Sequence, residues 1–270
     1  MTYSAREASI QSGEPIELFD FARGDTHWRY TSAKASQSYN TRTWESALIQ
    51  RGNIEHTAEK GRSNLRITCS RDLEIADLFR TQPPSDVITV TVHRFHAGET
   101  SGAVVWMGRV LNCEWTGAAA TLNCEPVSTS LARPGLRRLY QRQCPHVLYG
   151  PACRLNKATF AVAAELTTVS GVTLSASEFD AQPDGYFAGG FLEYTNPDST
   201  IERRFITGHA GADVTINLPL SVFAAGSQIV AYPGCDHALS TCSAKFSNSD
   251  NYGGFPYIPT KNPFGGSSLY

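Results

Sequence analysis

The sequence lacks any long apolar run, although hydrophobic residues make up 41% of its 270 residues. A membrane-spanning helix needs about 20 consecutive, mostly apolar residues, so we predict no transmembrane segment. The first residues, MTYSAREASIQSGEP, also lack the apolar core of a secretory signal peptide. We therefore expect a globular protein that is made and folded in a cytoplasm.

Charged residues are scarce as well. Only 18% of the residues are Asp, Glu, Lys or Arg, and the formal net charge is -2. This balance gives no overall positive footprint for duplex nucleic acid, so we expect no specific nucleic-acid binding. Few charges together with many Thr, Ser, Gly and Tyr residues indicate a β-rich chain whose surface is partly covered by other subunits.

The common signatures of catalysis are missing. The sequence contains no G-x-S-x-G, no H-E-x-x-H and no P-loop. Cys235 and His237, two residues apart, raise the alternative of a cysteine-dependent enzyme. Neighbours in sequence rarely have the geometry of a catalytic dyad, so we predict that the protein is not an enzyme.

Short alternating segments indicate a mainly β fold. They are rich in Val, Ile, Thr and aromatic residues, and turn-forming residues separate them, as in antiparallel sandwiches and barrels. Helix is sparse, and only 70–80 and 134–143 have helix-start or helix-stop residues. The predicted strands are 15–21, 27–32, 88–95, 102–110, 187–194, 202–209, 213–218 and 227–232.

A change of sequence character near residue 135 predicts two domains. Strand-like segments with tight turns precede it, whereas a basic, irregular segment and then a new set of strands follow it. We therefore predict an N-terminal β-rich domain over 1–135 and a C-terminal β-rich domain over 136–270. Each is expected to be a barrel-like or sandwich-like unit with short helices.

Four of the seven cysteines form two loop pairs. Eight residues separate Cys144 from Cys153, and six separate Cys235 from Cys242. Each pair lies beside Gly and Pro residues, and an odd total fits a disulfide framework poorly. Four thiolates from two irregular loops can bind a tetrahedral zinc ion or an iron–sulfur cluster.

Spacing alone leaves metal ligation and disulfides open, because CxxC knuckles and the bacterial ferredoxin spacing are both absent. The charge of segment 131–160 favours a cluster, since it contains six basic residues and no acidic one. Basic side chains lower the cost of burying a negatively charged cluster, although such a run can also face solvent or a partner. The six are Arg133, Arg137, Arg138, Arg142, Arg154 and Lys157. The three remaining cysteines, expected to be buried core thiols, are Cys69, Cys113 and Cys124.

The C-terminal half resembles a known family. The motifs are CPHVLYGPAC, YPGCDHALSTC, KF-x-N and NYGGFPYIP, spread over 144–259. They look like the C-terminal region of phage minor tail proteins of the lambda L type and of the iron–sulfur hub proteins of gene transfer agents. The resemblance implies a structural virion protein with a 4Fe–4S cluster in its C-terminal domain. The cluster is expected to stabilise the fold of that domain. Carried onto this sequence, the cluster ligands are Cys144, Cys153, Cys235 and Cys242.

The same resemblance implies a place and partners. A baseplate hub of this kind is a homotrimer around the DNA channel at the tail tip, assembled in the bacterial host cytoplasm. It would contact the distal tail protein, the end of the tape measure and a central fibre or receptor-binding hub protein. The tail segment 251–259 is expected to be extended and anchored by Tyr252, Phe255 and Tyr257. A zinc-stabilised binding module that uses the same four cysteine ligands is the alternative.

Overall fold

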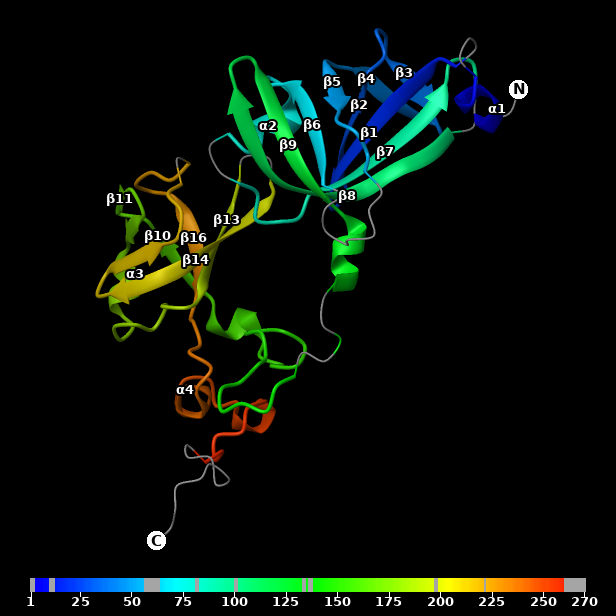
Figure 1. Ribbon diagram of the computed structural model, residues 1–270. Coiled ribbons are helices and arrows are strands. Elements are labelled where there is room, and N and C mark those ends of the chain that lie inside the picture. Colours follow the sequence, from blue (N-terminus) through cyan, green and yellow to red (C-terminus); the bar gives the residue numbers. More distant parts are fainter. Residues whose placement is uncertain are drawn as a thin grey trace. The chain divides into compact units, whose positions relative to one another are not determined.

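The structure is a computed structural model that describes residues 3–9, 13–55, 64–80, 83–99, 102–132, 135, 138–196, 199–220 and 222–259. The chain divides into two compact units, Met1–Arg133 and Pro134–Tyr270. Each unit has its own sheet (Figure 1). Each also has its own apolar core. Strands dominate and the helices are few and short, which confirms the predicted mainly β class.

The first unit is built on one nine-stranded sheet. Its elements are α1 (Tyr3–Glu7), β1 (Pro15–Arg23), β2 (Thr26–Thr31), β3 (Gln37–Tyr39), β4 (Arg42–Ser46), β5 (Ile49–Arg51), β6 (Leu65–Ser70), α2 (Glu74–Asp77), β7 (Thr89–His96), β8 (Gly102–Thr116), β9 (Ala119–Pro126) and the 3-10 helix η1 (Val127–Ala132). The strand order is β3-β4-β2-β1-β7-β8-β9-β6-β5. Neighbouring strands are antiparallel except for the parallel pair of β2 and β4.

Alternation of apolar residues creates the core of this sheet. Every second residue of β9 is buried, and Ala120, Leu122 and Cys124 have no exposed surface. Phe19 and Phe21 on β1 follow the same spacing and join the same core. Side chains of a strand point to opposite faces in turn, so this spacing places the apolar set on one face.

The second unit contains a seven-stranded sheet. Its elements are η2 (Lys157–Phe160), β10 (Val162–Glu165), β11 (Thr168–Ser170), β12 (Thr173–Ser175), α3 (Ser177–Asp180), β13 (Phe191–Thr195), β14 (Ile201–Ala210), β15 (Asp213–Ile216), β16 (Gln228–Tyr232), α4 (Leu239–Ala244) and η3 (Ser249–Asn251). The order β10-β16-β13-β14-β15-β12-β11 is antiparallel throughout. Leu174, Phe187, Leu192 and Ile206 lie at the centre of its core.

Two sequence-based helices do not form as expected. Segment 70–80 is helical only over α2, because Ser70 pairs with Ala119 as the last residue of β6 and so cannot cap a helix. In segment 134–143, residue 135 and residues 138–143 form no helix, while 134, 136 and 137 lie outside the described residues. Within the described ranges, no helix has the length and apolar character to cross a bilayer.

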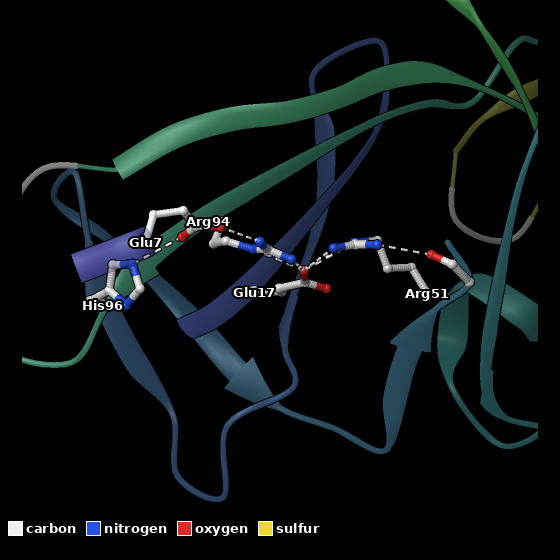
Figure 2. A network of polar contacts seen from close by, with 6 residues as sticks. Glu7, Glu17, Arg51, Arg94 and His96 are labelled. Carbon is white, nitrogen blue, oxygen red and sulfur yellow. Dashed lines mark hydrogen bonds and ion pairs between the residues drawn. The ribbon is translucent and has the colours of Figure 1, made fainter. Parts of the chain in front are cut away.

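A polar network joins α1, β1, β5 and β7 in the first unit (Figure 2). One Glu17 oxygen accepts hydrogen bonds from Arg51 Nη2 at 2.6 Å and from Arg94 Nη2 at 2.8 Å. Arg94 also donates to Glu7 on α1, whose other oxygen lies 3.0 Å from His96 Nε2. Burial raises the pKa of Glu7, but its contacts with Arg94 and His96 outweigh this and lower the pKa overall. The network therefore connects strands that are not neighbours in the sheet.

We expect Glu17→Gln to destabilise the first unit by about 2 kcal/mol. The Arg51 and Arg94 side chains are only 14% and 23% exposed, so removing their shared carboxylate leaves Arg51 poorly compensated and Arg94 paired with Glu7 alone. The midpoint of urea unfolding, followed by circular dichroism, measures the change. Glu45→Gln on the exposed side of β4 is the matched control, expected to stay within about 0.5 kcal/mol. Equal midpoints for the two variants would rule out this role of Glu17.

Candidate metal centre

The four cysteines of the two loop pairs line one small cavity in the second unit. Cys144 and Cys153 lie in the irregular segment before η2, Cys235 lies shortly after β16, and Cys242 lies on α4. All seven cysteines are free thiols, so no disulfide closes either loop. The remaining wall residues are His146, Leu148, Leu155, His237, Phe246, Asn248, Asn251 and Tyr252.

Glycine allows the second cysteine loop to leave the sheet. A Cβ at Gly234 would collide with the backbone of Ala188, Gly189 and Gly190. Gly189 has a φ of 78°, a left-handed conformation that favours glycine. The backbone just before Cys235 therefore runs in direct contact with the turn that leads into β13.

Hydrogen bonds join the two cysteine loops to each other. The Cys144 amide donates to His237 O at 2.9 Å, and the Tyr149 hydroxyl donates to Pro233 O at 3.0 Å. The Tyr149 ring also contacts Phe246, which lines the cavity. The first loop is thus held against the second by polar contacts and by aromatic packing.

Three of the four sulfurs face N–H donors. The His237 amide donates to Cys235 Sγ at 3.3 Å, the Gly253 amide to Cys144 Sγ at 3.4 Å, and Asn248 Nδ2 to Cys153 Sγ at 3.7 Å. The Cys242 thiol instead donates to the backbone oxygen of Asn248 at 3.3 Å. Donors aimed at sulfur stabilise thiolates and are a means of tuning iron–sulfur clusters.

The cavity by itself disfavours charged thiolates. Burial raises the pKa of Cys235, and the hydrogen bond from the His237 amide partly lowers it. Nearby Asp236 and the thiols of Cys144 and Cys153 raise this pKa further. Burial also raises the pKa of Cys242, with a smaller effect from the other three thiols. Clustered thiolates therefore need a cation between them, and binding of a cationic metal group would release protons.

The basic residues of segment 131–160 differ in their surroundings. Lys157 Nζ donates to the nearly buried Glu193 carboxylate at 2.7 Å, as does Arg203 Nε at 2.8 Å. Lys157 therefore compensates a carboxylate of the sheet. Arg138, Arg142 and Arg154 are exposed, and Arg133 and Arg137 lie outside the described residues.

Lys245 is a cation near the cavity, and the sequence by itself does not indicate its role. Its ammonium group donates to Gly234 O at 2.8 Å and to Tyr186 O. Burial lowers the pKa of Lys245, while the neighbouring Cys235 and Asp236 act in the opposite direction. The motif KF-x-N contained the residue, but only the fold shows that it lies beside the second cysteine loop.

Part of the tail segment covers the first cysteine loop. The Tyr252 hydroxyl lies 2.6 Å from Arg142 O and 3.1 Å from His237 O, and the Phe255 amide donates to Gln141 O at 2.8 Å. The contacts of the Tyr252 hydroxyl agree with the expected anchoring by this residue, whereas Phe255 is 40% exposed and is held through its backbone amide. Tyr257 is 91% exposed, so its expected anchoring role is wrong.

The cysteines outside the loop pairs lie in the first unit. Cys69 and Cys124 are buried in its core, and burial raises the pKa of each to about 12. Cys113 lies half-buried at the edge of the same core, with its pKa raised to about 11. Such high values keep these thiols protonated and unreactive at neutral pH.

The four cavity cysteines do not form a preformed site for one ion. Among the side chains that the structure describes, no three His, Cys, Asp or Glu groups gather closely enough to hold a single metal ion. The donor set around the cavity, with its four thiols and amide donors to sulfur, nevertheless suits a sulfur-ligated group.

Sequence comparisons connect the chain with phages. Residues 185–262 match the model of a family described as "Phage conserved hypothetical protein BR0599". An uncharacterized protein of Xylella fastidiosa (strain 9a5c) is 27% identical over 166 residues, which cover 57% of this chain. The matched region spans 35% of that relative, about a third of its length.

A structural comparison identifies a similar solved chain. It belongs to a structure described as "Virion of native gene transfer agent (GTA) particle" and is 21% identical, with a TM-score of 0.78. The match covers 96% of this chain and 93% of that chain. At this identity, the likeness shows that the two chains share a fold.

We expect Gly234→Ala to destabilise the second unit by about 1–3 kcal/mol, because the added methyl group must displace backbone rather than a flexible side chain. The readouts are the urea unfolding midpoint and the rate at which Cys235 is alkylated. Gly208→Ala on β14 is the control, since its nearest atoms would lie 3.9 Å from the new Cβ. If both variants behave like the unmodified protein, the backbone contact at Gly234 does not constrain the loop.

Proposed function

We propose that the protein is a structural component of a phage or phage-like virion and acts as a baseplate hub at the tail tip. The observation that carries this proposal is the shared fold with the gene transfer agent virion chain, which extends over nearly the whole length of both chains. The match of residues 185–262 to a phage-conserved family supports the same assignment from sequence.

The proposed hub is a homotrimer that surrounds the DNA channel. It links the distal tail protein and the end of the tape measure to a central fibre or receptor-binding protein. Large apolar side chains are exposed on both units, and burying them against neighbouring subunits would favour such assembly. Exposed examples are Leu48, Met107, Leu131, Tyr140, Val147 and Phe205. This role is structural and requires no catalytic residue.

The proposed cofactor is a 4Fe–4S cluster held by Cys144, Cys153, Cys235 and Cys242. When bound, the cluster would supply a covalent cross-link between the two cysteine loops. The chain's own residues hold the loops together and direct amide donors at the sulfurs. Cys153 and Cys235 are 82 positions apart, so joining them removes much freedom from the unfolded chain.

A zinc ion is the alternative occupant of the same cavity. Zinc requires four sulfurs, each about 2.3 Å from one point, whereas a cuboidal cluster binds each cysteine through a different iron. A zinc-stabilised module would use the same four ligands but would be colourless. Metal and sulfide analysis therefore separates the two occupants.

We expect protein purified without oxygen to be brown, with broad absorbance at about 400 nm and about four irons and four acid-labile sulfides per chain. Cys235→Ser should abolish the colour and make the second unit protease-sensitive, since several kcal/mol of stabilisation are lost. Cys69→Ser in the first unit is the control and should keep both iron and sulfide. Stoichiometric zinc without sulfide would reject the cluster.

A reconstruction of the assembled tail tests the hub role. We expect three copies of the chain around the tail axis at the tip, because a closed ring there must match a threefold fibre beyond it. The first unit can be recognised by its nine-stranded sheet and the second by its seven-stranded sheet. Six copies, or a location away from the tip, would contradict the proposed hub.

A further inference from the structure

Asn248 lies in the cavity wall, where the two cysteine loops meet. It follows α4 and is only 9% exposed. Its Nδ2 donates to Cys153 O at 2.7 Å and to Cys153 Sγ at 3.7 Å. Its Oδ1 accepts a hydrogen bond from Asn251 Nδ2 at 2.7 Å. The whole amide group is therefore engaged on the cavity side of the chain.

The backbone of Asn248 contacts the second cysteine loop. Its amide donates to Cys242 O at 3.0 Å, and its carbonyl accepts the Cys242 thiol at 3.3 Å. One residue thus contacts a cysteine of each pair, Cys153 being 95 positions away in sequence. A change at this residue acts on both loops at once.

The orientation of the Asn248 amide is fixed by its partners. The carbonyl of Cys153 can only accept, so the side-chain nitrogen, not the oxygen, must face it. The oxygen then faces the amide nitrogen of Asn251, which can only donate. The N–H groups are consequently directed at Cys153, next to its sulfur.

We propose that Asn248 is a positioning residue that holds Cys153 in the cavity wall and directs an N–H group at its sulfur. An N–H donor draws electron density from a ligand sulfur, which raises the reduction potential of a cluster bound to it. The effect on a cluster rests on the proposed function, whereas the hold on Cys153 does not. The two can therefore be tested separately.

Two substitutions at Asn248 remove the donor, and one at Asn156 serves as the control. Asn248→Leu has a similar size but removes the N–H without adding charge, whereas Asn248→Asp removes it and adds a negative charge. Asn156→Asp is the matched control, because Asn156 accepts from the Ala158 amide at 3.1 Å and aspartate can do the same. Asn248→Ala replaces the leucine variant where circular dichroism shows that the latter does not fold.

The first measurement uses the metal-free chain. Iodoacetamide alkylation at a fixed pH, followed by mass spectrometry of each cysteine, reports how firmly Cys153 is held in the cavity wall. We expect Asn248→Leu and Asn248→Asp to speed its alkylation several-fold, because the Cys153 carbonyl loses its 2.7 Å hydrogen bond, with Asn156→Asp unchanged. If Cys153 in the leucine variant is alkylated at the rate of the unmodified protein or more slowly, the proposal is overturned.

The second measurement uses the protein loaded with iron and sulfide. We expect the midpoint potential to become more negative in both Asn248 variants and to stay constant in Asn156→Asp. A shift in Asn248→Asp alone would show an effect of charge and would reject the role of the donor. If the chain binds no iron and sulfide, the cluster proposal fails, and the alkylation result still decides whether Asn248 acts on Cys153.

Discussion

In the second unit, four thiols from distant parts of the chain converge on one cavity. No single helix or strand carries them, so backbone contacts such as that from Cys144 to His237 must hold the loops in place. Burial and mutual repulsion raise the pKa of Cys235 and Cys242 and so oppose ionisation. A cationic centre removes this opposition, because it deprotonates its ligands and attracts them to one point. We therefore propose that such a centre would stabilise the local structure.

The seven-stranded sheet supplies the support on which the cysteine loops rest. Gly234 allows the chain to pass directly from β16 into the second loop. Glu193 on β13 holds Lys157 just after the first loop, and Tyr149 packs its ring between the loops and the sheet. A metal centre bound in the cavity would join the two cysteine loops to each other and, through these contacts, to the seven-stranded sheet. This arrangement suits a part that must keep its shape within a larger assembly.

The sequence allowed much of the fold to be predicted because strand alternation is a local signal. Every second residue of β9 is buried, as its pattern of apolar residues requires. The helix expected over 70–80 failed because pairing of Ser70 with Ala119 outweighed its capping preference. The spacing of the four cysteines left their pairing open, and only the family resemblance of their motifs implied that all four converge, as they do around the cavity. The role of Asn248 could not be predicted, because its contact with Cys153 joins residues 95 positions apart.

The central claim is that one iron–sulfur centre joins the two cysteine loops. The most direct measurement is an anomalous difference map at the iron absorption edge, from crystals grown without oxygen. The account predicts one strong peak in the cavity, within bonding distance of the sulfurs of Cys144, Cys153, Cys235 and Cys242. No iron peak there, or a peak at the zinc edge alone, would contradict it.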